Sequence, residues 1–256
     1  MTNTVEQSVV MAMDGSDSHL FPYLPYILQD VWEMGASSKV VLKLVEQHAT
    51  DYSNLKVLDL GCGKGAVLIK LAKAFNCHCH GIDAVEEFIE QAKSKAKAFH
   101  VDEYCYFECD DIRARVTELK GYNIIILGAI GPVLGGYHAT LTKLSSCIKE
   151  GGFVIIDDAY IGDGSDYSHP LMEKKSEILK QSSDAGMKLI DEIILSKDEV
   201  NASDEYLYQN IKKRCQELIE KYPSKRKLFI DYINKQEEEN EVLEQKVICS
   251  TMLFGK

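Results

Sequence analysis

A glycine-rich loop between an apolar segment and an amphipathic segment constrains this chain more than any other feature. Residues 56–60 read KVLDL and predict a short strand, and residues 61–65 read GCGKG. Apolar side chains then recur at helical spacing from Val67 to Phe75, which predicts a helix directly after the loop. Glycines let the backbone turn sharply and touch a ligand, and the free N–H groups of the following helix point toward that ligand. A tight strand-to-helix turn without a ligand is the alternative.

The loop belongs to a regular alternation of strands and helices. Further strands are predicted at residues 77–82, 104–109, 122–127 and 153–156, with helices between them. The helix before the last of these strands is expected to include Leu141, Leu144 and Ile148 and to stop at Gly151-Gly152. Such alternation is typical of a parallel sheet that is covered by helices on both faces.

The two ends of the chain depart from this alternation. Residues 1–20 are polar and are expected to be only locally ordered, and a short helix is expected at about residues 27–34. Toward the C-terminus, predicted strands at residues 189–195 and 247–254 flank a helical hairpin at about residues 203–245. Two strands that are joined in this way can lie antiparallel to each other.

A carboxylate ends the second predicted strand. Asp83 lies 18 residues after Gly65, close to the spacing of about 20 residues at which an acid accepts hydrogen bonds from ribose hydroxyls. The alternative role for Asp83 is to cap the next helix. A nucleotide-binding role is equally compatible with a dinucleotide and with other adenosine-containing ligands.

Three features argue against a dinucleotide. The glycines are spaced G-x-G-x-G, whereas dinucleotide-binding loops read G-x-G-x-x-G. Asp59 stands two residues before the first glycine, where its charge suits the ammonium group of an amino acid and repels a pyrophosphate. The third strand closes with the carboxylates of Glu108, Asp110 and Asp111, which are suitable acceptors for an adenine amino group.

Taken together, these motifs resemble the class I S-adenosylmethionine-dependent methyltransferases. The resemblance rests on residues 57–65, Asp83, Asp110-Asp111-Ile112, Gly128-Ala129 and the run Ile148-Lys149-Glu150-Gly151-Gly152-Phe153. It is close over about residues 56–160 and loose in the tail, where the hairpin and the N-terminal helices are similar to a bacterial small-molecule subgroup termed type 11. It implies an α/β, Rossmann-like sheet of seven mostly parallel strands in the order 3-2-1-4-5-7-6, with the seventh strand antiparallel.

The resemblance also divides the single domain of residues 1–256 into three parts. Residues 1–50 form an N-terminal helical cap or lid, residues 51–161 form the cofactor-binding core, and residues 162–256 form a substrate-side part with the hairpin. The implied cofactor is S-adenosylmethionine, with S-adenosylhomocysteine as product.

Five residues are assigned to the methionine end of the cofactor by the resemblance. Gly61, Cys62 and Gly63 contact the methionine part through their backbone, Gly128 lines the same end, and Asp59 orients the ammonium group.

Five further residues are assigned to the adenosine end. Asp83 holds the ribose, and Ala84 packs under the adenine. Asp111 accepts a hydrogen bond from the adenine amino group, and the backbone N–H of Ile112 meets a ring nitrogen. Asp110 takes the place of Asp111 if the register is shifted by one residue.

The acceptor side carries no recognisable catalytic motif, and no catalytic residue is assigned. A sulfonium is already a strong electrophile, so positioning supplies much of the acceleration, and a base is needed only for a nucleophile that holds its proton tightly. Residues 128–138 lack the Asn/Asp-Pro-Pro-aromatic signature of base-amine methyltransferases and the Pro-Cys nucleophile of cytosine-C5 enzymes. The substrate-side candidates, each with an ordinary structural role as alternative, are Tyr26, Trp32, His138, Asp158 and Tyr160.

Composition favours a small-molecule acceptor. The formal net charge is −11, and no basic stripe is evident for binding phosphates. Methylation of a nucleic acid or a protein, and a non-catalytic S-adenosylmethionine-binding sensor module, are the alternatives, with a nicotinamide-dependent oxidoreductase ranked last. No apolar run reaches the roughly 20 residues that span a bilayer, and no secretion signal is read at the N-terminus, so a cytoplasmic location without membrane contact is expected. A homodimer is left open.

Four consecutive residues, Cys77-His78-Cys79-His80, suggest a metal site at first sight. On an extended strand, however, the two cysteines point to one face and the two histidines to the other, so the four side chains cannot close around one ion. No metal is therefore expected, and the thiol face is predicted to pack inside.

Overall fold

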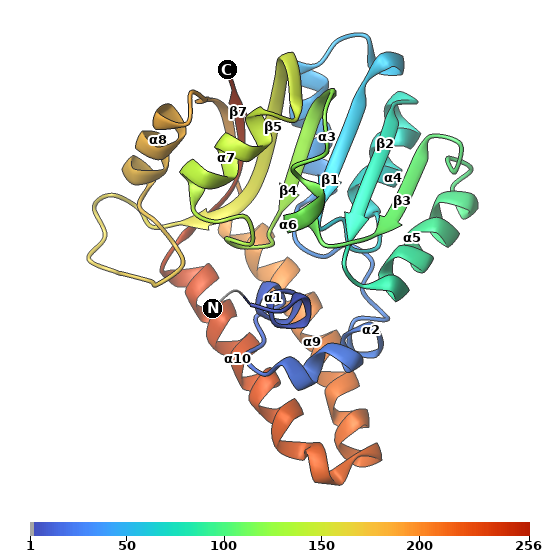
Figure 1. Cartoon of the computed structure of the whole chain (residues 1–256). Helices are drawn as coiled ribbons and strands as arrows, with labels where there is room; N and C mark the ends of the chain where they lie inside the picture. Colours follow the sequence, from blue (N-terminus) through green and yellow to red (C-terminus); the bar gives the residue numbers. More distant parts are fainter. Residues whose placement is uncertain (1–2) are drawn as a thin grey trace.

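The computed structural model describes residues 3–256 and contains one seven-stranded sheet with the order β3-β2-β1-β4-β5-β7-β6 (Figure 1). The strands are β1 Lys56–Leu60, β2 His78–Asp83, β3 Cys105–Cys109, β4 Tyr122–Gly128, β5 Ile148–Tyr160, β6 Lys188–Ile194 and β7 Ile248–Gly255. Strands β1 to β5 pair in parallel, whereas β7 pairs antiparallel with both β5 and β6. The predicted fold class, strand order and direction of the last strand are confirmed.

Helices cover both faces of the sheet, because the central strands carry apolar side chains on both sides. One face packs on α3 Ser38–His48, α4 Ala66–Phe75 and α5 Glu86–Ala98, and the other on α6 Ile112–Arg115, α7 Tyr137–Ser145 and α8 Lys175–Asp184. On β1, Val57 belongs to the first core and its neighbour Leu58 to the second. Both side chains are fully buried, so the sheet lies inside the molecule apart from its edges.

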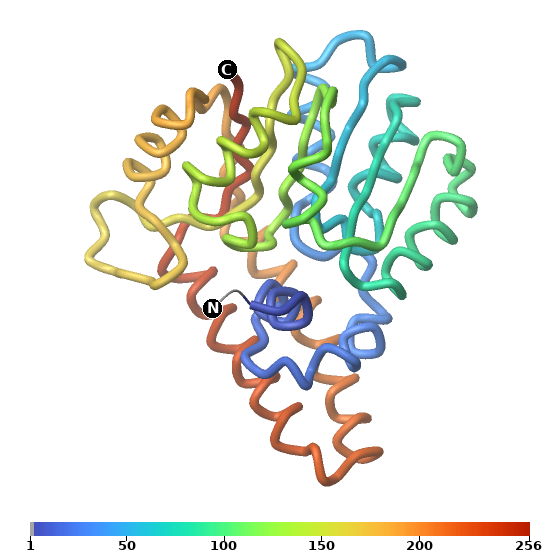
Figure 2. Tube along the Cα trace, viewed as in Figure 1, coloured from blue at the N-terminus to red at the C-terminus, as the bar shows by residue number. Residues whose placement is uncertain are grey.

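A helical cap lies beyond the carboxyl ends of the parallel strands (Figures 1 and 2). It combines α1 Val5–Ala12, the 3₁₀ helix η1 Ser18–Tyr23 and α2 Leu24–Ile27 with the hairpin α9 Lys197–Lys221 and α10 Arg226–Gln245. Short 3₁₀ turns, η2 Tyr52–Asn54 and η3 Pro223–Lys225, precede β1 and α10. Leu24 and Phe229 lie in a third apolar core that also includes Phe88 of α5, so this core joins the cap to the sheet domain. Among residues 3–256, no helix is both long and apolar enough to cross a bilayer.

Several boundaries differ from the predicted ones. Residues 5–12 and 18–23 are helical, and Thr4 begins α1 with a capping box to Gln7; the first two residues lie outside the described part. The helix predicted at residues 27–34 is wrong, because α2 ends at Ile27 and the following segment packs against the glycine loop. The helix α8 was not predicted, and α9 begins at Lys197, six residues before the predicted start of the hairpin, because Ser196 forms a capping box with Glu199.

The predicted extension of the helix before β5 is also wrong. Helix α7 ends at Ser145, and Ile148 instead begins β5 by pairing with Tyr122. Gly151, with φ of 73°, lies inside the strand where the β4–β5 register shifts. An irregular strand start that ends in glycines has the same apolar spacing as a last helical turn, and the pattern alone does not separate them.

The thiol face of β2 packs inside, as predicted. Cys77 and Cys79 are buried with their sulfur atoms 3.7 Å apart, whereas His78 is exposed. Within residues 3–256, no group of three or more His, Cys, Asp or Glu side chains has an arrangement that could hold a metal ion.

Candidate functional site

The glycine loop is held by backbone hydrogen bonds at the end of β2. The N–H groups of Gly61 and Cys62 both donate to the carbonyl oxygen of Ile82, at 2.8 and 3.0 Å. Gly61 and Gly63 have φ values of 81° and 50°, which side chains rarely tolerate. A Cβ atom on Gly61 would lie 2.8 Å from a side-chain carbon of Ile130. The loop therefore needs glycine both for its conformation and for close approach.

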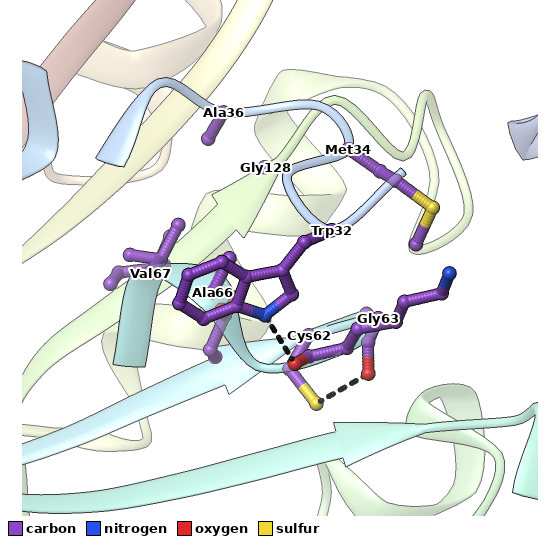
Figure 3. Close-up of a pocket in the computed structure, with 12 residues that line it drawn as sticks. Trp32, Met34, Ala36, Cys62, Gly63, Ala66, Val67 and Gly128 are labelled. Atoms are coloured by element: carbon purple, nitrogen blue, oxygen red, sulfur yellow. Dashed lines mark hydrogen bonds between the residues drawn. The ribbon is translucent and has the colours of Figure 1, made fainter. Parts of the chain in front are cut away.

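A first cavity, of about 360 Å³, lies on one side of this loop (Figure 3). Its walls come from three segments: the stretch after α2, the β1–α4 loop and the end of β4. They are Trp32, Met34, Ala36, Asp59, Gly61, Cys62, Gly63, Lys64, Ala66, Val67, Ile126 and Gly128. All five residues predicted for the methionine end are therefore brought together around one space.

Asp59 contributes a carboxylate to this cavity. The side chain is only 4 % exposed, and it has no hydrogen-bond partner within the described residues. Burial, with a contribution from the nearby Asp83, raises the pKa of Asp59 to about 7. A buried carboxylate without a partner is costly, so a cation in the cavity would be strongly favoured.

A second cavity, of about 520 Å³, is lined by four of the five residues predicted for the adenosine end. Asp83, Ala84, Asp111 and Ile112 line it together with Gly61. Apolar side chains of α1 and of the segment after β4 complete its walls: Val5, Val9, Ala12, Met13, Ile130 and Val133. Gly61 lines both cavities, so both spaces lie against the glycine loop. Apolar walls with a few placed polar groups are typical of cofactor sites.

Asp83 connects the loop to the end of β2. One carboxylate oxygen accepts from the N–H of Gly63 at 2.8 Å, and the other accepts from the N–H of Val85 at 2.9 Å. Burial raises the pKa of Asp83 despite these backbone hydrogen bonds. The alternative role of Asp83 as the cap of the next helix is wrong, because Val85 is the N-cap residue of α5 and this cap has no side-chain hydrogen bond. Asp83 instead holds the turn that leads into the helix. Each oxygen keeps a free lone pair with which it can accept from a ribose hydroxyl.

Asp111 is tied to an arginine. It is the N-cap of α6 and accepts from the N–H of Arg113 at 2.9 Å. The Arg113 guanidinium donates to both Asp111 oxygens, at distances from 2.8 to 3.0 Å, and holds the pKa of Asp111 below its usual range. A further guanidinium nitrogen donates to Ser8 of α1, so Arg113 attaches α1 to the rim of the second cavity. Asp110, in contrast, is exposed and lines neither cavity.

The substrate-side candidates do not gather in one place. Of the five, only Trp32 lines a cavity. Tyr26 donates from its hydroxyl to Glu217 of α9 at 2.6 Å, and His138 is exposed on α7.

The two candidates at the end of β5 face the second core. Asp158 accepts from the hydroxyl of Tyr137 at 2.9 Å. Tyr160 is 4 % exposed, and the Lys175 ammonium lies 4.4 Å from the centre of its ring. Both contacts belong to packing between β5, α7 and α8, and neither side chain lines either cavity.

Several lining residues were missed by the sequence reasoning. The apolar residues Met34, Ala36, Ile130 and Val133 carry no chemical signal of their own. Lys64 lies inside the recognised loop, yet nothing in the motif shows that its side chain is buried.

Carboxylates dominate the region where the cap meets β5 and β7. Burial, with Glu239, raises the pKa of Asp14 to about 7. Burial, with Glu244 and Glu239, raises the pKa of Asp204 to about 6. Burial also raises the pKa of Asp157, at the end of β5, to about 6. These acids are partly protonated at neutral pH, and the negative charge that they keep is unfavourable for a phosphodiester backbone.

The sequence matches a protein family model and several known proteins. Residues 51–246 match the family model described as "Methyltransferase domain". Carboxy-S-adenosyl-L-methionine synthase of Aliivibrio fischeri is 25 % identical over 135 residues, which are 51 % of this chain and 54 % of that protein. Malonyl-[acyl-carrier protein] O-methyltransferase of Bacillus cytotoxicus is 30 % identical over 116 residues, 45 % of this chain and 39 % of that protein. The matched segments thus span about half or less of these relatives.

A solved structure shows the same fold over nearly the whole chain. The S-adenosylmethionine-dependent methyltransferase of Thiobacillus denitrificans, in complex with S-adenosyl-L-homocysteine, superposes with a TM-score of 0.73 at 16 % identity. The match covers 91 % of this chain and 97 % of that one. With the family model covering most of the sequence, the chain belongs to the methyltransferase domain family.

Proposed function

We propose that this chain binds S-adenosylmethionine across the two cavities and transfers its methyl group to a small-molecule acceptor. The methionine end would lie in the first cavity, with its ammonium group at Asp59 and its backbone contacts at Gly61, Cys62, Gly63 and Gly128. The adenosine would lie in the second cavity, with Asp83 at the ribose. The observation that carries the proposal is the unpartnered, buried carboxylate of Asp59 beside a glycine-rich loop.

At the adenine end, the ion pair between Asp111 and Arg113 changes the contact that we propose for Asp111. Both oxygens of Asp111 already accept from Arg113. The adenine amino group would therefore share an acceptor that is held in place and kept ionised by the guanidinium. Ala84 and the Ile112 N–H would supply the flat contact and the ring-nitrogen contact of the same cavity.

Charge supports a small acceptor over a nucleic acid. Asp14 and Asp204 of the cap and Asp157 at the end of β5 place acids where the cap meets the sheet, the side from which we expect an acceptor to approach. A basic surface for a polyanion would have to lie at this junction. The free state of all eight cysteines supports a reducing compartment, which we propose to be the cytoplasm. Light scattering of the purified chain decides between a monomer and the homodimer that the sequence leaves open.

We expect calorimetry to show binding of S-adenosylhomocysteine in the micromolar range or tighter and no binding of NADH. The reason is that Asp59 favours an ammonium and disfavours a pyrophosphate. Binding of NADH with no response to S-adenosylhomocysteine would overturn the assignment of the cofactor.

The acceptor class needs a separate experiment. The chain is incubated with methyl-labelled S-adenosylmethionine and with a cell extract that has been divided by size into a metabolite fraction and a macromolecular fraction. We expect label to appear in the metabolite fraction. Label in nucleic acid or protein alone would support a nucleic-acid or protein methyltransferase. Tight cofactor binding without transfer to any fraction would support a non-catalytic sensor module.

A further inference from the structure

The glycine loop contains a buried cation that the cofactor contacts above do not use. Lys64 is 1 % exposed, and its ammonium donates to the backbone carbonyls of Leu28 at 2.5 Å and Val31 at 2.7 Å. The ring of Phe88 lies 5.5 Å from the same nitrogen. Burial lowers the pKa of Lys64 to about 8, so the side chain is still mostly protonated at neutral pH. No carboxylate forms an ion pair with it within residues 3–256. Two peptide carbonyls are thus its main acceptors.

The segment after α2 also donates a hydrogen bond back to Lys64. The indole N–H of Trp32 donates to the backbone carbonyl of Lys64 at 3.1 Å (Figure 3). The ammonium groups of Lys95 and Lys70 lie 4.6 and 5.5 Å from the centre of the same indole, and Lys70 forms an ion pair with Glu33. Residues 28–36 are named here the latch segment. Three hydrogen bonds therefore join this segment to Lys64 of the glycine loop, and α4 and α5 add contacts through Lys70 and Lys95.

The fastened latch segment forms a wall of the first cavity. A Cβ atom on Gly63 would lie 2.9 Å from the terminal carbon of Met34, and one on Gly128 would lie 2.8 Å from the Cβ of Ala36. Figure 3 shows the side chains of Trp32, Met34 and Ala36 on the side of the loop that faces the cavity. A ligand at the methionine end is consequently enclosed between the glycine loop and this segment.

We propose that Lys64 is a positioning residue that fastens the latch segment onto the glycine loop and thereby limits how fast the methionine end of the cofactor leaves. The inference rests on the proposed cofactor site but makes a separate claim about the unliganded protein. Removing the ammonium leaves the Val31 carbonyl without its donor and the Leu28 carbonyl with only the N–H of Val31. The segment then loses both side-chain hydrogen bonds that Lys64 makes to it.

The test uses Trp32, which is the only tryptophan of the chain, as a fluorescent reporter. Lys64→Met keeps an unbranched apolar side chain that is one atom shorter, and it removes the three N–H donors. We expect the unliganded variant to show at least twofold stronger quenching of Trp32 by acrylamide. We also expect stopped-flow fluorescence to show at least tenfold faster dissociation of S-adenosylhomocysteine, with a smaller change in the association rate. Lys73→Met, at an exposed position of α4, is the matched control and should leave both values unchanged.

A second variant separates the loss of the ammonium contacts from a folding defect of Lys64→Met. Lys64→Gln retains N–H donors without the charge, so we expect changes in the same direction but smaller. Unchanged quenching in both folded variants would overturn the fastening, and increased quenching with an unchanged dissociation rate would overturn its role in cofactor release. If the wild-type chain fails to bind S-adenosylhomocysteine, the proposed function fails, and unchanged Lys64→Met quenching is then still the outcome that refutes the fastening.

Discussion

Replacing Asp83 by alanine is expected to weaken S-adenosylhomocysteine binding by about a hundredfold. Hydrogen bonds to a charged group contribute about 1.5–3 kcal/mol each, and two of them to the ribose hydroxyls correspond to a factor of about 100 or more in affinity. The substitution also removes the acceptor of the Gly63 and Val85 N–H groups. Leaving these two donors unsatisfied costs about 1–3 kcal/mol each. The measurement is calorimetric titration at pH 7.5, together with thermal unfolding of the unliganded variant.

A second substitution separates the two effects. Asp83→Asn retains one carbonyl oxygen for the backbone donors, so we expect it to unfold closer to the wild-type temperature while still losing most of the affinity. Asp102→Ala, an exposed carboxylate before β3, is the matched control. If both Asp83 variants fold and bind S-adenosylhomocysteine within twofold of the wild type, the ribose lies elsewhere.

Sequence reasoning succeeded where one local signal repeats. Each of β1 to β5 follows a helix or a turn with its own apolar period, and parallel pairing of such units leaves few arrangements of the sheet. The strand order and the antiparallel β7 were therefore predictable once the motifs at residues 57–65 and 148–153 were recognised. The prediction that the helix from Leu141 continues through Ile148 was wrong, because a strand start that is interrupted by glycines has the apolar spacing of a helical turn.

The residues that wall the site from distant segments were less predictable than those of the strand-end motifs, which form its floor. The floor, from Asp59 to Gly63 and again at Asp83, comes from contiguous motifs at strand ends. The walls come from contacts between segments far apart in sequence, such as Trp32 with Lys64 and Arg113 with Ser8. Neither contact has a local signal, because an indole or an arginine packs equally well on many partners. The cofactor roles of the floor residues stay predictions, and the binding experiments above test them.

Replacing Asp59 by asparagine is expected to change stability and binding in opposite directions. Burial raises the pKa of Asp59 to about 7 in the folded chain, against about 3.9 when unfolded. A pKa raised on folding contributes stability that is complete below pH ~3.9 and is lost as the pH rises to about 7. Ionised Asp59 therefore destabilises the unliganded protein at pH 8. Neutral asparagine avoids this cost, and after the cost of a buried amide is subtracted we expect a gain of about 2 kcal/mol, or about 4 °C in the unfolding midpoint.

The proposed ammonium group of the ligand would bind the ionised form of this same carboxylate. For the wild type, we expect affinity for S-adenosylhomocysteine to fall about tenfold per pH unit below about pH 7, because the cation binds the ionised form of Asp59. For Asp59→Asn, we expect affinity at pH 8 to be about a hundredfold weaker and to vary little between pH 6 and pH 8, since a charge-assisted hydrogen bond of about 3 kcal/mol is lost. Melting curves and titrations at both pH values, with Asp102→Asn as control, measure both effects. A misfolded variant would lose stability and affinity together, so a higher melting temperature with weaker binding isolates the charge. If asparagine raises the melting temperature and leaves the affinity unchanged, Asp59 is a buried acid without a ligand.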